Sequence, residues 1–148
     1  MEAPGFLARA FAEAEAAGKR GEIPVGAVVV RGGRVVGAAG NRVEEMCDPS
    51  AHAEILALRE AAAALGSPRL EGCDLYVTLE PCAMCAAAIA FARIRRLYFG
   101  AYDPKGGGVE HGARIFAQPT CHHRPEVIGG LEERRSSALL KAFFLDKR

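Results

Sequence analysis

The order of the apolar segments constrains the fold more than any other feature of this sequence. Two β-strand patterns, at residues 25–30 and 35–38, flank the turn Arg31-Gly-Gly-Arg34, which is typical of a tight hairpin. Beyond this hairpin, helical and strand patterns alternate along the chain. A hairpin followed by alternating helices and strands predicts the α/β class, with a three-layer α/β/α arrangement around a mixed five-stranded sheet.

Apolar periodicity and helix start and stop residues divide the rest of the chain into further elements. Helices are predicted over 4–18, 52–66, 83–92, 112–117 and 131–146, with Pro81 at the start of the third. Strands are predicted over 74–79, 96–99 and 127–128, the second of them broken by Gly100. Residues 42–50 contain charged side chains and the turn-forming residues Asp48 and Pro49, and are predicted to form a loop.

The length and the cysteine count limit the kind of protein. A chain of 148 residues has room for one domain, 1–148, which can bury a sizeable core without help from a metal. Five cysteines are an odd number, and the start of the chain lacks the basic and apolar regions of a secretory signal. The longest uncharged apolar stretch, 81–92, is too short to cross a membrane. We therefore expect a soluble, cytoplasmic protein with reduced thiols and no membrane partner.

Three residues have the types and positions of metal ligands. Cys82 and Cys85 are three apart in the first turn of a predicted helix, so both sulfurs lie on one face near the positive end of the helix dipole. His52, at the start of the preceding helix, adds a nitrogen. Three protein ligands and one open position are the arrangement of a catalytic zinc, so the sequence predicts one Zn²⁺ per chain.

Glu54 indicates what the open position is for. Residues two apart point to different sides of a helix, so Glu54 is poorly placed to bind the same ion as His52. Its side chain is long enough to reach a water beside the metal, where a carboxylate can accept a proton and pass it to a leaving nitrogen. This chemistry suits hydrolytic attack on a carbon that carries an amino group.

Two other interpretations of the same residues are open. A structural zinc would take its fourth ligand from Cys47, Cys73, Cys121 or another histidine, although these three cysteines are expected to be inert. A redox Cys-x-x-Cys pair also follows a strand in many proteins, but it would leave His52 and Glu54 without a role.

The His-x-Glu and Pro-Cys-x-x-Cys pair carries a resemblance to the zinc nucleobase deaminases. More specifically, the chain resembles the bacterial tRNA-specific adenosine deaminases. The resemblance runs through Ile23-Pro-Val-Gly-Ala-Val28, Asn41-Arg42, Ala51-His-Ala-Glu-Ile-Leu-Ala-Leu58, Leu75-Tyr-Val-Thr-Leu-Glu-Pro-Cys-Ala-Met-Cys85, Phe99-Gly100 with Asp103, His123-Arg124 and the closing helix. It covers nearly the whole chain, which implies a cytidine-deaminase-like fold and a single zinc-dependent deaminase domain.

The resemblance also implies roles for individual residues. His52, Cys82 and Cys85 would hold the zinc, and Glu54 would shuttle protons during attack of water on C6 of adenine. Asn41 would recognise the base, and the backbone at Ala53 and Pro81 would border the ring. Asp103 and His123 lie in segments that would line the RNA backbone. The family acts on the wobble adenosine of an arginine tRNA as a homodimer, so tRNA and a second copy are the expected partners.

Net charge by itself argues against a nucleic-acid partner, because 19 Lys and Arg face 18 Asp and Glu, a total of +1. The total hides a difference between two halves: residues 1–92 hold 8 basic and 12 acidic side chains, and 93–148 hold 11 and 6. A basic surface near the zinc site would form if the fold brought together Arg93, Arg95, Arg96, Lys105, Arg114, Arg124 and the basic residues of the closing helix, Arg134, Arg135, Lys141, Lys147 and Arg148.

Two segments have ordinary interpretations. Gly106-Gly-Gly108 lacks a following Lys-Ser or Lys-Thr and is interpreted as a flexible loop. The apolar stripe of the closing helix, which includes Leu139, Leu140, Phe143 and Phe144, is interpreted as core or dimer packing.

Three functions are compatible with these residues. The first is hydrolytic deamination of adenosine to inosine at the wobble position of tRNA. The second is deamination of a free base or nucleoside, of guanine or cytosine type, on the same zinc site. The third, from a different class, is a non-catalytic zinc-stabilised RNA-binding module.

Overall fold

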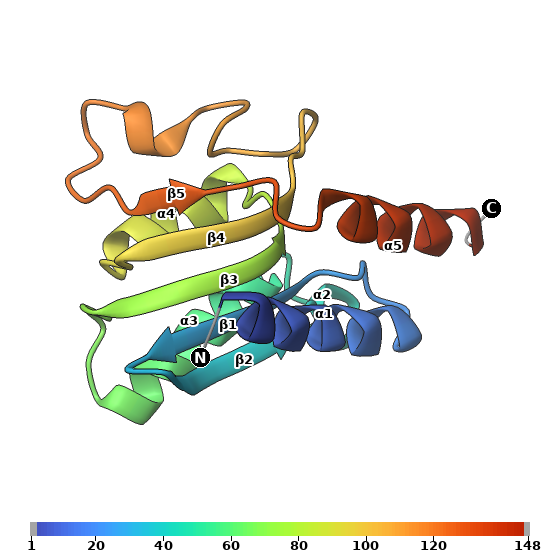
Figure 1. Cartoon of the computed structure of the whole chain (residues 1–148), viewed down its shortest axis with the longest axis horizontal. Helices are drawn as coiled ribbons and strands as arrows, with labels where there is room; N and C mark the ends of the chain where they lie inside the picture. The colour runs from blue at the N-terminus through green and yellow to red at the C-terminus, as the bar shows by residue number, and fades with distance from the viewer. Residues whose placement is uncertain (1–2, 147–148) are drawn as a thin grey trace.

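A computed structural model describes residues 3–146, which form a five-stranded sheet between two layers of helices (Figure 1). The strands are β1 (Gly26–Arg31), β2 (Arg34–Gly40), β3 (Cys73–Leu79), β4 (Arg96–Ala101) and β5 (Glu126–Ile128), in the spatial order β2-β1-β3-β4-β5. β1 is antiparallel to β2 and β3, while β3, β4 and β5 are mutually parallel. The predicted mixed sheet is confirmed.

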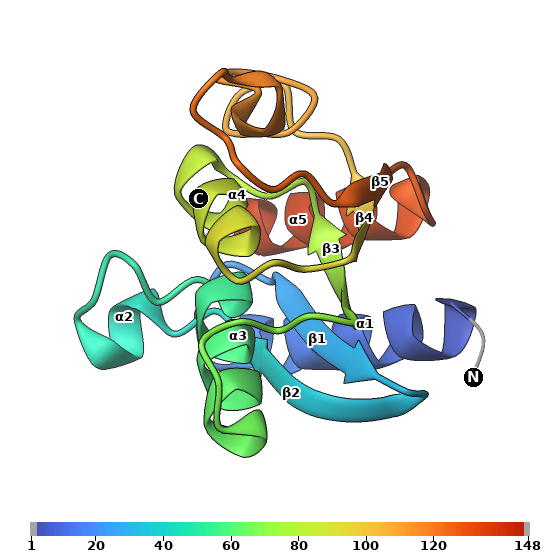
Figure 2. The ribbon, with the colours of Figure 1, turned by 90° about the vertical axis from the view of Figure 1, so that its left-hand side faces the viewer.

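Helices cover both faces of the sheet. The helices are α1 (Ala3–Lys19), α2 (Val43–Met46), α3 (Ala53–Leu65), α4 (Ala83–Phe91) and α5 (Glu133–Asp146), with a 3-10 turn η1 (Ile115–Ala117). α1 and α5 lie on the face nearer the viewer in Figure 1, and α3 and α4 lie on the opposite face, to the left of the strands in Figure 2. The three-layer prediction is therefore confirmed.

The alternation of side chains along β1 explains why the sheet needs both layers. Ala27 and Val29 pack into the core under α3 and α4, while Val28 and Val30 pack against α1. A strand that is apolar on both faces is stable only when both are covered. Within residues 3–146, none of the helices combines the length and apolar character that a membrane span requires.

The hairpin between β1 and β2 forms as its glycines predict. Gly32 and Gly33 have φ values of +57° and +76°, the positive values that a two-residue hairpin turn of the right twist demands at both central positions. Because β2 then runs back along β1, it ends beside the start of β1 and brings Asn41 to the end of the sheet where α3 begins.

The segment 42–50 is not entirely a loop, because it contains the one-turn helix α2. The cause is a distant carboxylate: Glu22 accepts hydrogen bonds from the backbone N–H groups of Glu44 and Glu45 at 3.1 and 2.9 Å. These are donors that a first helical turn leaves without a partner. Glu22 stands about twenty residues earlier in the chain, so no local pattern in 42–50 indicates this helix.

Three smaller expectations also need correction. Pro81 precedes α4 rather than starting it, and Cys82 is the N-cap residue. Gly100 lies within β4 and does not break it. A Cβ there would lie 2.2 Å from the carbonyl oxygen of Thr78, so glycine permits the close approach of β3 and β4. The predicted helix over 112–117 is reduced to the single turn η1.

Candidate metal centre and substrate cavity

The starts of two helices meet at one end of the sheet, beyond the carboxyl end of β3. His52 is the N-cap residue of α3 and Cys82 is the N-cap residue of α4, and both have extended backbone conformations. The two helices lie side by side on the same face of the sheet (Figure 2). Their N-termini carry partial positive charge, which favours a thiolate at this position.

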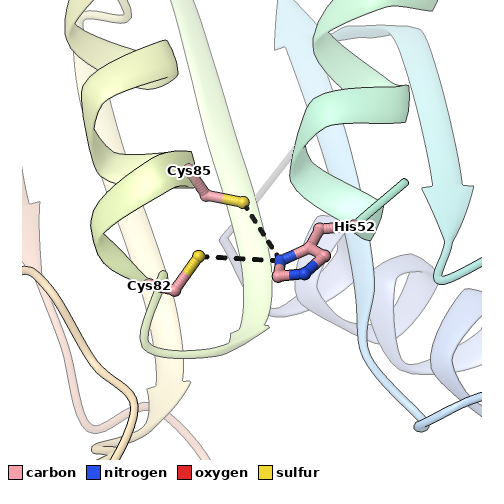
Figure 3. A group of neighbouring side chains, drawn as sticks. All are labelled: His52, Cys82 and Cys85. Atoms are coloured by element: carbon pink, nitrogen blue, oxygen red, sulfur yellow. Dashed lines mark hydrogen bonds between the residues drawn. The ribbon is translucent and has the colours of Figure 1, made fainter. Parts of the chain in front are cut away.

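The side chains of His52, Cys82 and Cys85 point at one another (Figure 3). Nδ1 of His52 lies 3.6 Å from Sγ of Cys82 and 3.5 Å from Sγ of Cys85. The three ligand atoms all lie within 4.8 Å of one another. Zinc bonds of about 2.3 Å to sulfur and about 2.0 Å to nitrogen, at a tetrahedral angle, would separate N from S by roughly 3.5 Å. The donor set therefore fits a zinc ion.

The protonation states agree with a ligand set. Hydrogen bonds from the Cys85 thiol and from His52, opposed by burial, lower the pKa of Cys82 to about 4. The hydrogen bond with Cys82, together with burial, raises the pKa of Cys85. The contact with Cys82 also raises the pKa of His52. A negative sulfur is thus held beside a second sulfur and an imidazole, which is the polar environment that a divalent cation neutralises.

The structure places the other cysteines away from this group. Cys47 is exposed at the end of α2, Cys73 is buried at the start of β3, and the thiol of Cys121 donates to the carbonyl oxygen of His123. Among residues 3–146, the cluster contains three ligands and lacks a fourth. This is the open arrangement of a catalytic zinc rather than the closed one of a structural zinc.

Glu54 stands in the first turn of α3, directly beside the ligand cluster, and only 4% of its surface is exposed. Burial raises the pKa of Glu54 to about 7, although hydrogen bonds from its own backbone and from Cys85 oppose the shift. It is not part of the three-ligand group. A buried carboxyl group next to an open metal position is placed to exchange protons there.

A cavity of about 570 Å³ opens over the cluster, a volume within the usual range for small-molecule sites. Its walls come from the ends of several elements, and the lining includes Asn41, His52, Glu54, Cys82 and Asp103. Phe143 of α5 lines it as well. The interpretation of Phe143 as core or dimer packing is therefore incomplete, because the closing helix also supplies an aromatic wall.

Asn41 is 8% exposed, and its side chain is hydrogen-bonded at both ends. Its Oδ1 accepts the N–H of Ala53 at 2.7 Å, and its Nδ2 donates to the carbonyl oxygen of Ile23 at 3.1 Å. An amide nitrogen carries two hydrogens, so a second N–H is available at the cavity wall. Ala53 and Pro81 are buried, and their chain neighbours His52, Glu54, Glu80 and Cys82 line the cavity.

The sequence reasoning missed Glu80, the residue before Pro81. Its carboxylate is buried under the segment 103–111 and accepts hydrogen bonds from that segment's backbone and from the ring of His111. Burial alone would raise the pKa of Glu80, but these donors hold it below its ordinary value. The signal for it in the sequence is a carboxylate at the end of a buried strand, where a charge needs partners.

The segment with the three glycines is packed rather than flexible. A Cβ on Gly107 would lie 2.5 Å from Cδ of Glu80, and a Cβ on Gly108 would lie 2.4 Å from the backbone nitrogen of Ala83. Glycine is needed at both positions because the backbone approaches its neighbours closely.

Asp103 and His123 are separated by the fold. Asp103 follows the carboxyl end of β4 and lines the cavity over the metal cluster. His123 lines a different cavity, beside α4 with Phe91 and Arg93, and Nε2 of its ring lies 2.7 Å from the carbonyl oxygen of Ile94.

Two members of the basic set do not lie beside the metal cluster. Arg95 and Arg96 lie at the amino end of β4, while the cavity lies at the carboxyl ends of β3 and β4. Both are paired, Arg95 with Asp74 at 2.9 Å and Arg96 with Glu126 at 2.8 Å. Two further basic residues, Lys147 and Arg148, lie outside the described residues.

Comparisons with known proteins agree with the geometry. Residues 2–101 match the family described as the cytidine and deoxycytidylate deaminase zinc-binding region. A tRNA-specific adenosine deaminase of Agrobacterium fabrum is 60% identical over 143 residues, 97% of this chain and 94% of that protein.

Two solved structures are similar. One, from biochemical and structural studies of A-to-I editing by tRNA:A34 deaminases at the wobble position of transfer RNA, is 60% identical with a TM-score of 0.91 and covers 93% of this chain and 99% of its own. The X-ray structure of guanine deaminase from Bacillus subtilis is 32% identical with a TM-score of 0.68 and covers 98% and 95%. The chain therefore belongs to the cytidine and deoxycytidylate deaminase zinc-binding family, in the group of the bacterial tRNA-specific adenosine deaminases.

Proposed function

We propose that this protein hydrolyses adenosine to inosine at the wobble position of a tRNA, with one zinc ion per chain and residues 1–148 acting as one deaminase domain. The observation that carries the proposal is the position of Glu54, buried beside the three-ligand cluster at the floor of the cavity. The similarity to a tRNA-specific adenosine deaminase over almost the whole chain supports the choice of substrate.

The residues divide the reaction between them. His52, Cys82 and Cys85 would hold a zinc ion, which would supply the Lewis acidity that makes water a nucleophile at neutral pH. Glu54 accepts the proton that this water loses and delivers it to N1 of the adenine ring. The water oxygen forms the C–O bond at C6 in this step. Glu54 then accepts the remaining proton from the new hydroxyl group at C6 and gives it to the amino group, so that the C–N bond breaks, ammonia leaves and a carbonyl group remains at C6.

The remaining cavity residues hold the base. The second N–H of the Asn41 amide faces a ring acceptor, and the backbone at Ala53 and Pro81 borders the ring. The adenine reaches the cavity splayed out of the anticodon loop, where unstacking costs little. Asp103 stands at the wall where the flanking nucleotides pass, and His123 contacts the RNA farther from the reacting base.

The test is an inosine assay on tRNA. The purified protein is incubated with a transcript of an arginine tRNA that has adenosine at the wobble position, and the digested RNA is analysed by mass spectrometry. The matched control is the same transcript with guanosine at that position. We expect inosine in the first transcript only.

Deamination of a free base is the second candidate, supported by the likeness to guanine deaminase. Parallel incubations with guanine and cytosine decide between the two. Turnover of a free base without inosine in the tRNA would reject the first proposal.

We further propose that the protein works in the cytoplasm as a homodimer. Phe91, at the end of α4, is 81% exposed and stands between two hollows with apolar lining. Aromatic residues are enriched at interfaces, and the apolar lining on both sides of Phe91 extends it into a larger patch. Sedimentation of the protein and of the variant Phe91→Asp tests the assignment: we expect a dimer for the first and a monomer for the second. A dimeric variant would reject this face as the interface.

A further inference from the structure

The carboxylate of Glu80 accepts several hydrogen bonds from one short segment of chain, residues 103–111. Its Oε1 accepts hydrogen bonds from the backbone N–H of Asp103 and from Nδ1 of His111, each at 2.9 Å. Its Oε2 accepts the backbone N–H groups of Val109, Glu110 and His111 at 3.2, 2.8 and 3.1 Å. The side chain is fully buried. A carboxylate has about four lone-pair positions, so these donors occupy its full capacity.

The donors come from both ends of the segment, and this closes it into a fixed loop. Asp103 opens the loop, and residues 109–111 end it. Between them, the N–H of Gly107 donates to the carbonyl oxygen of Asp103, and that of Gly108 donates to Pro81. The loop is thereby tied to the stretch of chain that leads into Cys82.

The closed loop forms one wall of the substrate cavity. Asp103 and Gly106 line the cavity together with His52 and Glu54. Gly107 packs so closely on Glu80 that a Cβ would lie 2.5 Å from its carboxyl carbon. The position of this wall relative to the metal ligands therefore depends on where the Glu80 carboxylate holds the backbone.

Glu80 itself is not available to the reaction. Its oxygens are occupied by donors from the loop, so it can neither carry a proton nor contact a base. We propose that Glu80 is a positioning residue that holds residues 103–111 as a preformed wall for the nucleotides flanking the target adenosine. This inference rests on the proposed tRNA substrate. It assigns to Glu80 an effect on substrate capture and none on metal binding.

The test compares Glu80→Gln with the native holoenzyme on the tRNA transcript. The glutamine side chain has an NH₂ group in place of one carboxylate oxygen. In either orientation this NH₂ group faces N–H donors of the loop, so at least one hydrogen bond is lost. We expect KM to rise roughly tenfold or more while kcat changes by less than about threefold, the pattern of lost binding that does not change in the transition state. Zinc content stays at one per chain.

The matched control is Glu110→Gln, which removes the same charge from an exposed position of the same loop. We expect this control to keep the native KM. A second variant, His111→Phe, keeps the ring and the backbone N–H but removes the Nδ1 contact, and we expect a smaller rise in KM. It also serves if Glu80→Gln does not fold. Hydrogen exchange of the backbone amides in residues 103–111 should be faster in Glu80→Gln and His111→Phe than in the native protein, and unchanged in Glu110→Gln.

The possible outcomes separate this inference from the proposed function. If the native protein makes no inosine in tRNA, the proposed function fails. If the native protein does make inosine, three results for Glu80→Gln and His111→Phe would show that the assignment of Glu80 is wrong: a native KM, a loss of zinc, or a fall in kcat alone.

Discussion

Oδ1 of Asn41 accepts the backbone N–H of Ala53 at 2.7 Å, and this contact fastens the end of β2 to the first turn of α3. The same turn carries His52 as its N-cap and Glu54. One hydrogen bond therefore links the edge of the hairpin to the start of the helix that carries a metal ligand and the proposed proton carrier.

Replacing Asn41 by alanine should weaken both stability and activity. The substitution leaves the N–H of Ala53 without a partner in a buried place, which costs roughly 1–3 kcal/mol of unfolding free energy. Urea denaturation measures this loss, and the inosine assay should show a raised KM. Ser50→Ala is the control, because it removes a side-chain hydrogen bond to Asp48 in the segment before His52. Equal behaviour of the two variants would contradict the role of Asn41.

Replacing Glu54 by alanine should separate chemistry from architecture. We expect zinc content and fold to be unchanged and turnover to fall by about 10²–10⁴-fold, because the proton carrier is gone. Glu60→Ala is the control, since Glu60 is an exposed carboxylate of the same helix. Full turnover by the Glu54 variant would reject Glu54 as the proton carrier, whereas no turnover by the native protein would favour a zinc-stabilised RNA-binding module.

Cys85→Ser should release the metal, because a neutral hydroxyl replaces the thiolate that zinc prefers. Elemental analysis of the purified variant measures the metal content directly. Cys47→Ser is the matched control, since Cys47 is exposed at the end of α2 and stands outside the ligand cluster. Full zinc occupancy in the Cys85 variant would overturn the ligand assignment.

Gly26→Ala should destabilise the fold by about 1–3 kcal/mol, because the added methyl group would lie 2.0 Å from the carbonyl oxygen of Ala10 and force β1 away from α1. Gly18→Ala is the contrasting variant. Its Cβ would make an ordinary contact of 3.4 Å with Pro24, and alanine favours the helical conformation of α1. Thermal unfolding of the two variants should shift in opposite directions.

Tyr76 should make the fold less stable in alkali. Burial, together with Tyr98 and Asp74, raises the pKa of Tyr76 to about 12 from its ordinary value of 10.0. The folded chain therefore keeps a proton that the unfolded chain releases above pH 10, so the stabilisation is complete below that pH and is lost as the pH rises toward 12. Urea midpoints at pH 9 and pH 11 should differ less for Tyr76→Phe than for the native protein. Tyr102→Phe, at a more exposed site, should behave like the native protein.

The metal ligands could be predicted from sequence because each depends on a local pattern. Cys82 and Cys85 belong to one helix start, and His52 belongs to another. Residue type and helix position together restrict what such a set can bind. The strands were equally predictable, since apolar runs of this length between turn residues have few other uses.

The parts that could not be predicted depend on contacts between distant residues. α2 exists because Glu22 accepts its first N–H groups, and the loop 103–111 is ordered because Glu80 accepts its backbone donors. A local sequence window cannot show either contact. The positions of Arg95 and Arg96 depend on strand direction, because a parallel pairing of β3 and β4 puts both residues at the end of the sheet opposite to the cavity.

Because Glu80 binds backbone N–H groups of the loop 103–111, the shape of the cavity wall does not depend on the exposed side chains of that loop. The backbone and its contacts form the frame of the wall, and the exposed side chains form its surface. The frame needs a carboxylate, a set of main-chain donors and two glycines, 107 and 108, while an exposed side chain such as Lys105 takes no part in it. Those exposed positions can therefore be exchanged without moving the wall. The fold offers a surface on which nucleotide preference can evolve, or be engineered, while the metal centre beneath it stays the same.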